Sequence, residues 1–255
     1  MSNKSFRVTL LIALCVLPLT AIADVDGLGR FTTSVPIEVP AFYGITPRVE
    51  LGYGGGGELA GSGWTLAAGS IIGRTSATRG TPRFAPDDLF WLDGAELVPC
   101  APGSTSPSCT TAVSAFGSSA GFYSTRVESF WRIRFEAGTW TVWDRDGTRR
   151  EYASGDGGLA YQLRWVTDTH GNRVEYRWVC QPGGAAPCVL DAIRYGASAA
   201  GPGAVIRTFR ESRPDERVAS TGLGRASYSE RLRSVTVWHH GSLVRAYRLR
   251  YQQSR

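Results

Sequence analysis

The sequence predicts an all-β protein, a meander of antiparallel hairpins that forms a curved sheet with little helix. Short segments alternate apolar and polar residues with the period of two that is typical of strands, and they are rich in Val, Ile, Thr, Tyr, Phe and Trp. Gly, Pro, Asp and Asn separate these segments, as expected for turns. No window keeps the spacing of an amphipathic helix over three turns.

The first residues differ from the rest of the chain. Two basic residues precede an apolar run, Val8–Leu19, and the small residues Ala21 and Ala23 follow it. This order is typical of a secretory signal peptide, and the run is shorter than the roughly 20 residues that a membrane span needs. We therefore predict a signal peptide at residues 1–23, with cleavage between Ala23 and Asp24 and no membrane segment afterwards. An uncleaved anchor and a lipidated Cys15 are the alternatives.

The charge of the mature chain is modest. Removal of residues 1–23 lowers the net charge from +6 to +4, because it takes away two basic residues and no acidic one. The arginines are scattered and often alternate with apolar residues, as in Arg132 and Arg134 or Arg248 and Arg250. A nucleic-acid partner would require a concentrated basic patch or a recognisable module, so none is predicted. We expect a secreted, extracellular protein, with the periplasm as the alternative location.

The predicted strands follow one another along almost the whole chain. They are Val35–Val39, Val49–Tyr53, Trp131–Phe135, Thr139–Trp143, Leu163–Val166, Val174–Trp178, Val205–Phe209, Val235–Trp238 and Val244–Tyr251. The sequence leaves room for a brief helix near Asp87–Leu89. Gly52–Gly57 matches G-x-G-x-x-G, but a dinucleotide site needs a helix after that motif. Because strands flank the motif on both sides, we interpret it as a wide bend and predict no cofactor.

Three segments share a pattern of strand, polar turn, glycine and a second strand that ends in tyrosine. They are Trp143–Tyr152, Val166–Tyr176 and, more loosely, Val237–Tyr247. Their Asp-Gly and Gly-Asn pairs suit the positive φ angles of tight hairpin turns. The pattern therefore predicts three hairpins.

Four cysteines remain after the signal peptide, in two close pairs: Cys100 with Cys109, and Cys180 with Cys188. Exported proteins favour disulfides, and an even number of cysteines at short spacing favours local bridges. Each pair brackets a stretch rich in small residues and proline. We predict two local disulfides. Zinc binding, which no histidine at ligand spacing supports, and other pairings remain open.

The residues that could act as nucleophiles or bases lack support from their neighbours. Ser119 has the spacing of a nucleophile elbow, but it lies in a small-residue loop before a strand, and His170 adds no other triad member. His239 and His240 are adjacent, so on a strand they are expected to point to opposite faces and not to share a metal.

The carboxylates give no catalytic pair or metal site either. Asp144 and Asp146 resemble the start of a calcium loop, but the later ligand positions hold Thr148 and Gly155, so a turn is favoured. The other carboxylates considered are isolated in sequence: Glu58, Glu96, Glu128 and Glu151. We therefore predict no enzyme activity, no catalytic residues and no metal.

A set of ordered blocks resembles one known family. The blocks begin with Gly27–Pro40 and Pro47–Tyr53, and weaker similarity continues through Tyr123–Phe130 and Leu232–Tyr251. Between them lie the family-motif positions Gly63, Trp64, Leu66, Arg74, Asp88, Phe90, Leu92, Asp93 and Gly94. This order is similar to the N-terminal domain of the Salmonella virulence plasmid B protein (SpvB) and of the B component of Tc insecticidal toxins.

The resemblance implies a scaffold rather than an enzyme. Residues 24–255 would be an SpvB-like β-domain, an incomplete segment of a larger toxin and part of an RHS/YD-repeat β-shell around a C-terminal effector. Its partners would be other toxin segments, a Tc-type C component or the effector. The ADP-ribosyltransferase of the resembling virulence protein is not carried over, because no Glu-x-Glu occurs here.

An alternative is a stand-alone exported domain that binds carbohydrate or a cell-surface partner through aromatics. The eight tryptophans are spread over nearly all predicted strands, which favours core packing. The last predicted strand would leave an unpaired edge that is able to pair with another chain.

Overall fold

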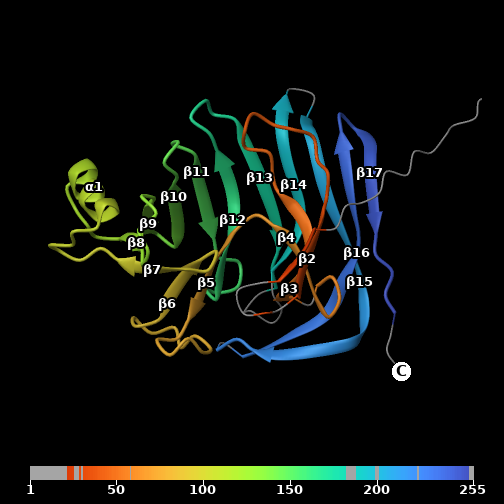
Figure 1. Cartoon of the computed structure of the whole chain (residues 1–255), viewed down its shortest axis with the longest axis horizontal. Helices are drawn as coiled ribbons and strands as arrows, with labels where there is room; N and C mark the ends of the chain where they lie inside the picture. The colour runs from red at the N-terminus through yellow and green to blue at the C-terminus, as the bar shows by residue number, and fades with distance from the viewer. Residues whose placement is uncertain are drawn as a thin grey trace, which may run out of the picture.

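The computed structural model of the chain describes residues 22–25, 29, 31–57, 59–181, 188–198, 201–222 and 224–252. The prediction of an all-β fold is confirmed: antiparallel strands make up two sheets, and one short helix is present in these ranges (Figure 1). Nearly all of the predicted signal peptide, residues 1–21, lies outside the described residues.

The N-terminal part forms a small antiparallel sheet with the strand order β1-β2-β3-β4. Its strands are β1 (Ile22–Val25), β2 (Phe31–Pro36), β3 (Val49–Gly57) and β4 (Gly63–Ala68). The predicted cleavage site between Ala23 and Asp24 falls within β1, which pairs with β2. The expected glycine bend is wrong: the glycines continue β3, and a register shift between Tyr53 and Gly57 accommodates them.

The second sheet begins as a closed barrel of eight strands. They are β5 (Ile71–Thr75), β6 (Leu89–Leu92), β7 (Ala95–Pro99), β8 (Phe122–Thr125), β9 (Arg132–Glu136), β10 (Thr139–Trp143), β11 (Arg149–Ala153) and β12 (Ala160–Thr167). Each strand pairs with the next, and β12 also pairs with β5, which closes the ring. Closure removes the edges that an open sheet would expose.

Beyond β12 the same sheet continues as an open meander. Its strands are β13 (Arg173–Val179), β14 (Val189–Ser198), β15 (Gly201–Ser220), β16 (Arg225–His239) and β17 (Ser242–Arg248). The three segments that end in tyrosine form the hairpins β10–β11, β12–β13 and β16–β17, as predicted. The last strand ends at Arg248, three residues before the predicted end at Tyr251.

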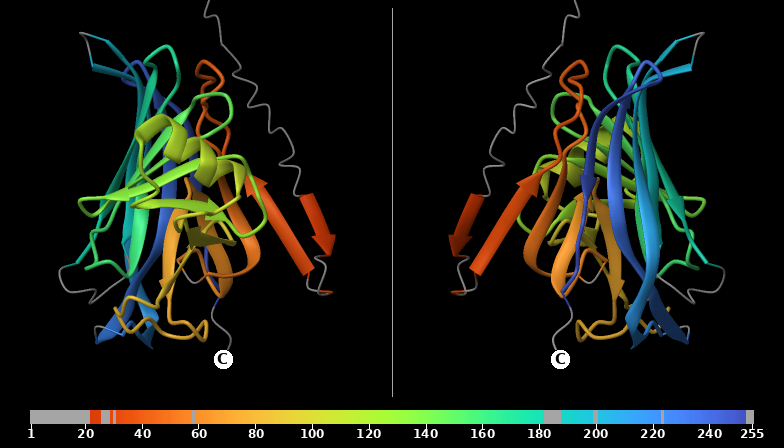
Figure 2. Two further views of the ribbon diagram at one scale, coloured as in Figure 1. Left: turned by 90° about the vertical axis from the view of Figure 1, so that its left-hand side faces the viewer. Right: turned by 90° about the vertical axis from the view of Figure 1, so that its right-hand side faces the viewer.

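The small sheet and the meander are two layers that pack face to face (Figure 2). Val49 of β3 and Ile206 of β15 belong to one buried core, together with the aromatic and aliphatic residues of the barrel. Hydrogen bonds also join the layers: Tyr195 Oη donates to the Pro40 carbonyl at 2.7 Å. The core therefore runs continuously from the barrel to the interface between the layers.

The hairpin of β15 and β16 forms a long arm that curls along the bottom of the molecule in Figure 1. Two register shifts in this hairpin accompany the bend. At its tip, Thr221 N–H donates to the Gly224 carbonyl at 3.0 Å. A side chain at Gly222, whose φ is 80°, would collide with the Pro82 carbonyl, so the tip lies directly against the loop between β5 and β6.

The one helix among the described residues, α1 (Pro107–Phe116), is not where the sequence predicts helix. The brief helix that the sequence allows near Asp87–Leu89 does not form, because a turn there leads into β6, which begins at Leu89. Pro107 begins α1, and Gly117 ends it with φ 71° and an N–H that donates to the Val113 carbonyl. The helix is too short and too rich in small residues to show an amphipathic pattern.

Candidate functional site

The chain passes at a junction from β4 of the small sheet into β5 of the barrel, and the family-motif residues lie on these two strands, on β6 and in the turns beside β6. In β4, the indole of Trp64 packs on Tyr53 of β3, with 5.4 Å between the ring centres. Gly63 has φ 76°, and a Cβ at this position would lie 2.8 Å from the Tyr53 ring. Glycine is therefore required for the ring to sit there. These β4 positions secure the strand that borders the junction.

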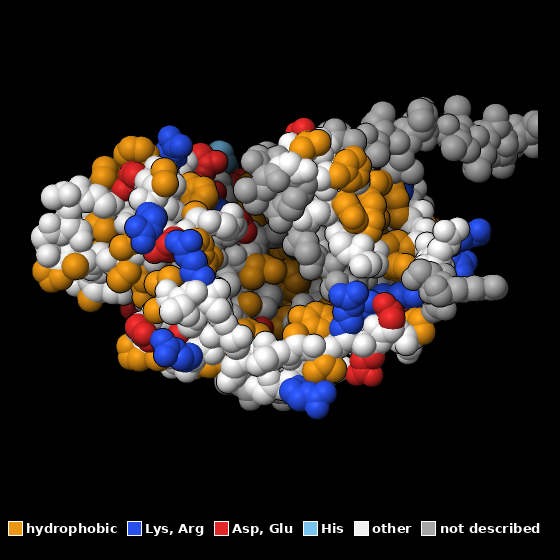
Figure 3. All heavy atoms as spheres, turned by 60° about the horizontal axis from the view of Figure 1, so that its bottom comes forward, with side chains coloured by type: hydrophobic (Ala, Val, Ile, Leu, Met, Phe, Trp, Pro, Cys, Tyr) orange, Lys and Arg blue, Asp and Glu red, His pale blue; other side chains and the backbone are white. Residues whose placement is uncertain are grey.

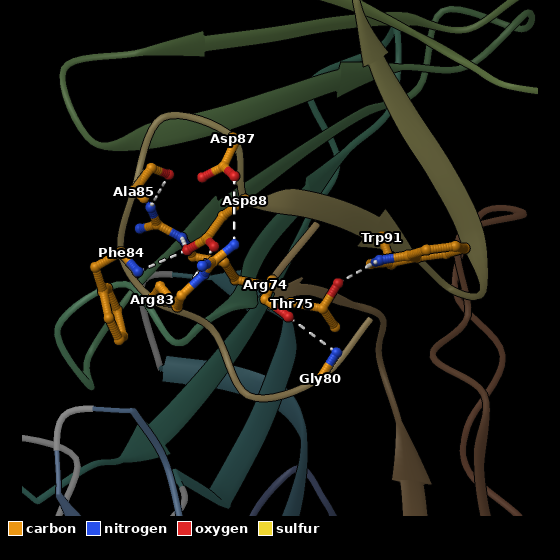
Figure 4. Close-up of polar contacts among 10 residues, drawn as sticks. Arg74, Thr75, Gly80, Arg83, Phe84, Ala85, Asp87, Asp88 and Trp91 are labelled. Carbon is orange, nitrogen blue, oxygen red and sulfur yellow. Dashed lines mark hydrogen bonds and ion pairs between the residues drawn. The ribbon is translucent and has the colours of Figure 1, made fainter. Parts of the chain in front are cut away.

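Arg74 at the end of β5 and Asp88 before β6 form a buried ion pair (Figure 4). Arg74 Nε donates to Asp88 Oδ2 at 2.8 Å, and the Asp88 side chain is fully buried. Asp88 also accepts the backbone N–H groups of Arg83 at 3.2 Å and Phe84 at 2.7 Å. The second arm of the guanidinium donates to the Ala85 carbonyl at 3.2 Å. The pair therefore fixes the loop against which the tip of the β15–β16 arm lies.

The electrostatics of this loop favour an ionised Asp88. Burial raises the pKa of Asp88, but the backbone N–H groups of Arg83 and Phe84 and the guanidinium of Arg74 outweigh it and hold the pKa below its usual value. The guanidinium also lies 4.8 Å from the Phe84 ring centre and 5.4 Å from that of Phe90. Together these contacts hold the Arg74 guanidinium within the loop.

Asp93 and Gly94 form the tight turn between β6 and β7. Their φ angles of 49° and 87° are both positive, as in the two-residue hairpin turns that favour Asp-Gly. Asp93 Oδ1 also accepts the Ile71 N–H at 3.3 Å, which joins the turn to the start of β5. Burial raises the pKa of Asp93. The preceding Leu92 is buried in the barrel core.

Both predicted disulfides are present with the predicted local pairing. Cys100 and Cys109 connect the end of β7 to α1, with Cα atoms 5.5 Å apart. Cys180 and Cys188 connect the end of β13 to the start of β14, with Cα atoms 4.1 Å apart. Because each bridge closes a short loop, it restricts the unfolded chain locally.

Glu96, which is isolated in sequence, and Asp144, which begins the turn after β10, both have arginine partners in space. Glu96 accepts from Arg126 in a two-pronged ion pair, at 3.0 and 2.8 Å. Asp144 pairs with Arg150 of β11. The sequence gives no signal for the first contact, because 30 residues separate its members. These pairs join neighbouring strands and loops and do not form the close carboxylate pair of an acid–base site.

The histidines differ from the sequence expectation. The rings of His239 and His240 do not point to opposite faces but lie 4.2 Å apart, because His240 leaves the strand with φ 46° and begins the turn. His170 is largely exposed at a different turn. Ser119 follows α1 and precedes β8, the reverse of the strand–helix order of a nucleophile elbow. Within the described residues, no group of three or more His, Cys, Asp or Glu could hold a metal ion.

Glu128, in the loop after β8, accepts several hydrogen bonds near the start of α1. The Ser106 and Ser108 hydroxyls donate to its two oxygens at 2.6 Å each, and the Phe130 N–H donates at 2.7 Å. Burial raises the pKa of Glu128, but these donors outweigh it and lower the pKa to about 2. The carboxylate thus joins the start of α1 to the loop after β8.

Replacing Glu128 by glutamine is expected to lower the free energy of unfolding at pH 7 by about 1.5–3 kcal/mol, the range for hydrogen bonds to a charged group. A lowered pKa stabilises the fold above the ordinary carboxyl pKa of 4.5, and this contribution is lost as the pH falls toward about 2. The difference between the two proteins should therefore shrink across this range. Urea unfolding at pH 7 and pH 3 measures it.

The matched control is Glu136→Gln, which removes an ion pair from a side chain that is 62% exposed. Its effect should not exceed about 1 kcal/mol. An equal loss for both variants, or a Glu128→Gln deficit that does not change with pH, would contradict the assignment.

An apolar cleft of about 480 Å³ lies beside β4 (Figure 3). Thr65–Ala68 of β4 line one side, and Trp178 and Leu190 of the meander line another. Ser227–Glu230 of the long arm close it, and Arg210 of β15 pairs with Glu230 at 3.3 Å on this border. Its size and lining fall in the range of binding sites.

No helix in the described part of the chain is long and apolar enough to cross a membrane.

Comparisons with known proteins agree on one family. The family model of the Salmonella virulence plasmid 65-kDa B protein (SpvB) matches residues 26–181. The N-terminal domain of the effector protein SpvB from Salmonella typhimurium strain LT2 superposes with a TM-score of 0.63 at 16% identity, over 86% of this chain and 98% of that domain. None of the curated proteins matches this chain.

Solved Tc toxin structures have the same fold. The TcdB2-TccC3-TEV structure gives a TM-score of 0.71 at 16% identity over 94% of this chain. The Photorhabdus luminescens Tc holotoxin pore gives 0.64 at 16% identity over 90% of this chain. The present chain spans only about 15% of the length of such Tc chains. At these identities the likeness establishes the fold and not the activity.

Proposed function

This chain belongs to the family of the Salmonella virulence plasmid 65-kDa B protein, and on that premise we propose that it is a non-enzymatic structural segment of a secreted bacterial toxin. In this role it contributes to a β-shell that encloses or presents a C-terminal effector. Its partners are other segments or subunits of the toxin complex, such as a Tc-type C component. The Tc structures that share its fold, including TcdB2-TccC3, support this choice of partner.

The observation that carries the proposal is the free edge of β17. This strand ends the large sheet, and within the described residues no strand pairs with its outer edge. Leu243 and Val244 are about half exposed there, at 52% and 51%. The Glu38 N–H donates to Tyr247 Oη at 3.0 Å, which holds β17 against the small sheet. A fixed, exposed edge is a template on which a further strand can extend the sheet.

The aromatic side chains favour the scaffold over the carbohydrate-binding alternative. None of the eight tryptophans is exposed. Arginine side chains cover several of their faces: Arg132 lies 4.5 Å from the ring centre of Trp143, and Arg173 lies 3.5 Å from that of Trp165. A sugar platform requires an open aromatic face, which the rings covered by arginine do not offer.

Affinity purification of the tagged full-length chain from its native host tests the proposal. We expect mass spectrometry to identify a co-purifying polypeptide that carries RHS/YD repeats or a toxin effector. The variant Leu243→Lys/Val244→Lys places charges on the β17 edge and should reduce this recovery at least about tenfold, without changing the melting temperature. The matched control is Val127→Lys, because Val127 is 85% exposed but lies away from β17.

Two outcomes would overturn the scaffold role. One is a chain that is secreted without any such polypeptide. The other is binding on a glycan array that is lost in Tyr43→Ala, which removes an aromatic ring that is 75% exposed. Equal recovery for the β17 variant and the Val127→Lys control would instead reject the β17 edge as the contact.

A further inference from the structure

β4 has an edge without a strand partner among the described residues. It ends the small sheet, in which only β3 pairs with it. The large sheet does not continue this edge, because the chain turns after Ala68 and β5 pairs with β6 and β12 instead. Backbone N–H and C=O groups on such an edge can pair with another strand wherever no other group bonds to them.

The register identifies the residues whose backbone groups face this edge. Ile37 N–H donates to the Val49 carbonyl at 2.8 Å on the β2 side. Because N–H and C=O of one residue point the same way in an antiparallel strand, Val49 does not bond to β4. Its opposite residue Ala68, and Leu66 two positions before, therefore turn their N–H and C=O outward. Trp64 has the same phase, but its N–H and C=O already bond to Gly61 and Ala60, so the open part of the edge is at Leu66 and Ala68. The position of Pro36 in β2 is consistent with this assignment. It lies opposite Glu50, at a position where no N–H of β2 has to bond to β3.

The apolar cleft lies along this edge. Four consecutive residues of β4, Thr65–Ala68, line it. Successive side chains of a strand point to opposite faces, so a cleft that reaches all four of them borders the edge and not one face. Trp178 and Leu190 supply apolar walls on the opposite side. An occupant of the cleft would therefore meet main-chain donors and acceptors on one side and apolar side chains on the other.

Arg210 adds a polar anchor to the cleft. Its Nε pairs with Glu230 at 3.3 Å, but its Nη1 is buried and has no hydrogen-bond partner among the described residues. A buried donor without a partner is unfavourable and would gain from an acceptor on an occupant. The acceptor best suited to a guanidinium is a carboxylate.

We propose that the β4 edge binds an extended peptide segment that adds a fifth strand to the small sheet. Main-chain hydrogen bonds to Leu66 and Ala68 hold the segment, its alternate apolar side chains fill the cleft, and an acidic side chain bonds to Arg210. This mode of recognition combines affinity from the backbone with selectivity from the pockets for alternate side chains. It uses a different edge from β17 and does not depend on the role in a toxin shell.

Fluorescence anisotropy with a labelled eight-residue peptide tests the proposal on the full-length chain. The peptide alternates valine and threonine and carries one central glutamate. A twin peptide with N-methyl groups on alternate amides keeps the side chains but loses one row of donors. We expect the parent to bind at least about tenfold more tightly than the twin, which corresponds to the loss of one or more hydrogen bonds. A glutamine-for-glutamate peptide should also bind less tightly.

Two protein variants separate the contribution of the Leu66 backbone N–H to binding from that of the Leu66 side chain. Leu66→Ala removes apolar surface and keeps the outward N–H, whereas Leu66→Pro also removes that N–H without breaking a bond to β3. We expect Leu66→Pro to bind at least about tenfold more weakly than Leu66→Ala. Circular dichroism verifies that both variants fold. If Leu66→Pro does not fold, the comparison of the two peptides still decides the question.

Absence of binding by the parent peptide, or equal affinities of the parent and the N-methylated twin, would overturn the proposal. Equal binding by folded Leu66→Pro and Leu66→Ala would overturn it as well. In Arg210→Met, the parent peptide and its glutamine version should bind with equal affinity. This result would support the role of Arg210, whereas an unchanged preference for glutamate would reject it.

Discussion

Replacing Arg74 by methionine is expected to destabilise the fold by about 3–5 kcal/mol, because it leaves the buried Asp88 carboxylate without its cation. The Arg74 side chain is only 16% exposed, so water cannot easily take its place. The Phe84 and Arg83 amides would still bond to Asp88, but two backbone dipoles do not replace a full charge. Urea unfolding followed by tryptophan fluorescence at pH 7 measures the loss.

The matched control lies in the same loop. Arg83 and Asp87 form an ion pair whose side chains are 62% and 58% exposed, so Arg83→Met should cost no more than about 1 kcal/mol. The double variant Arg74→Met/Asp88→Leu should recover part of the loss, because it removes the uncompensated charge. Equal effects of Arg74→Met and Arg83→Met would show that the buried pair does not hold the loop.

The pH dependence gives an independent readout of the same pair. Since the pKa of Asp88 is lowered in the folded protein, its ionisation stabilises the fold above the ordinary carboxyl pKa of 3.8. This contribution is lost as the pH falls through the lowered value. The deficit of Arg74→Met relative to the unmodified chain should therefore be largest at neutral pH and smaller in acid.

Local features of this fold were predictable from the sequence because short-range chemistry determines them. Thr139–Trp143 matches β10 at both ends, and the Asp-Gly pair at Asp146 and Gly147 lies in the turn of the predicted β10–β11 hairpin, with φ 87° at Gly147. Both disulfides close loops of small residues, where neighbouring cysteines meet before any distant ones. In the strand, the turn and both disulfides, the interacting residues are within about ten positions of one another in sequence.

The long-range features could not be predicted, because strand periodicity identifies a buried face but not the partner strand. Nothing in the alternation of β5 and β12 indicates that Tyr161 lies opposite Ile72 and closes the barrel. The same holds for the partnership of Arg126 with Glu96. The contact between His239 and His240 was mispredicted because a single positive φ redirects the second ring. The cleft beside β4 depends on how the two layers pack, which no local pattern encodes.

Replacing Trp140 by alanine is expected to cost about 3–5 kcal/mol of unfolding free energy, because it opens a cavity at the centre of the barrel. The Trp140 side chain is fully buried, and four aromatic rings surround it. The distances between ring centres are 4.7 Å to Tyr123, 4.8 Å to Phe135, 5.1 Å to Phe90 and 6.1 Å to Tyr161. These rings come from four other strands of the barrel, so they cannot all move inward to fill the space.

Trp140→Phe separates the packing of the indole from its polar group. The indole Nε1 is buried and has no hydrogen-bond partner among the described residues, so its N–H is a cost that phenylalanine removes. The ring stack is largely kept, and the net loss should remain below about 1.5 kcal/mol. Urea unfolding followed by far-UV circular dichroism, which does not depend on the lost tryptophan, compares the two variants. A loss for Trp140→Ala as small as that for Trp140→Phe would mean that the barrel core collapses around the gap. Closure of β12 onto β5 would then impose less rigidity on the centre than the aromatic packing indicates.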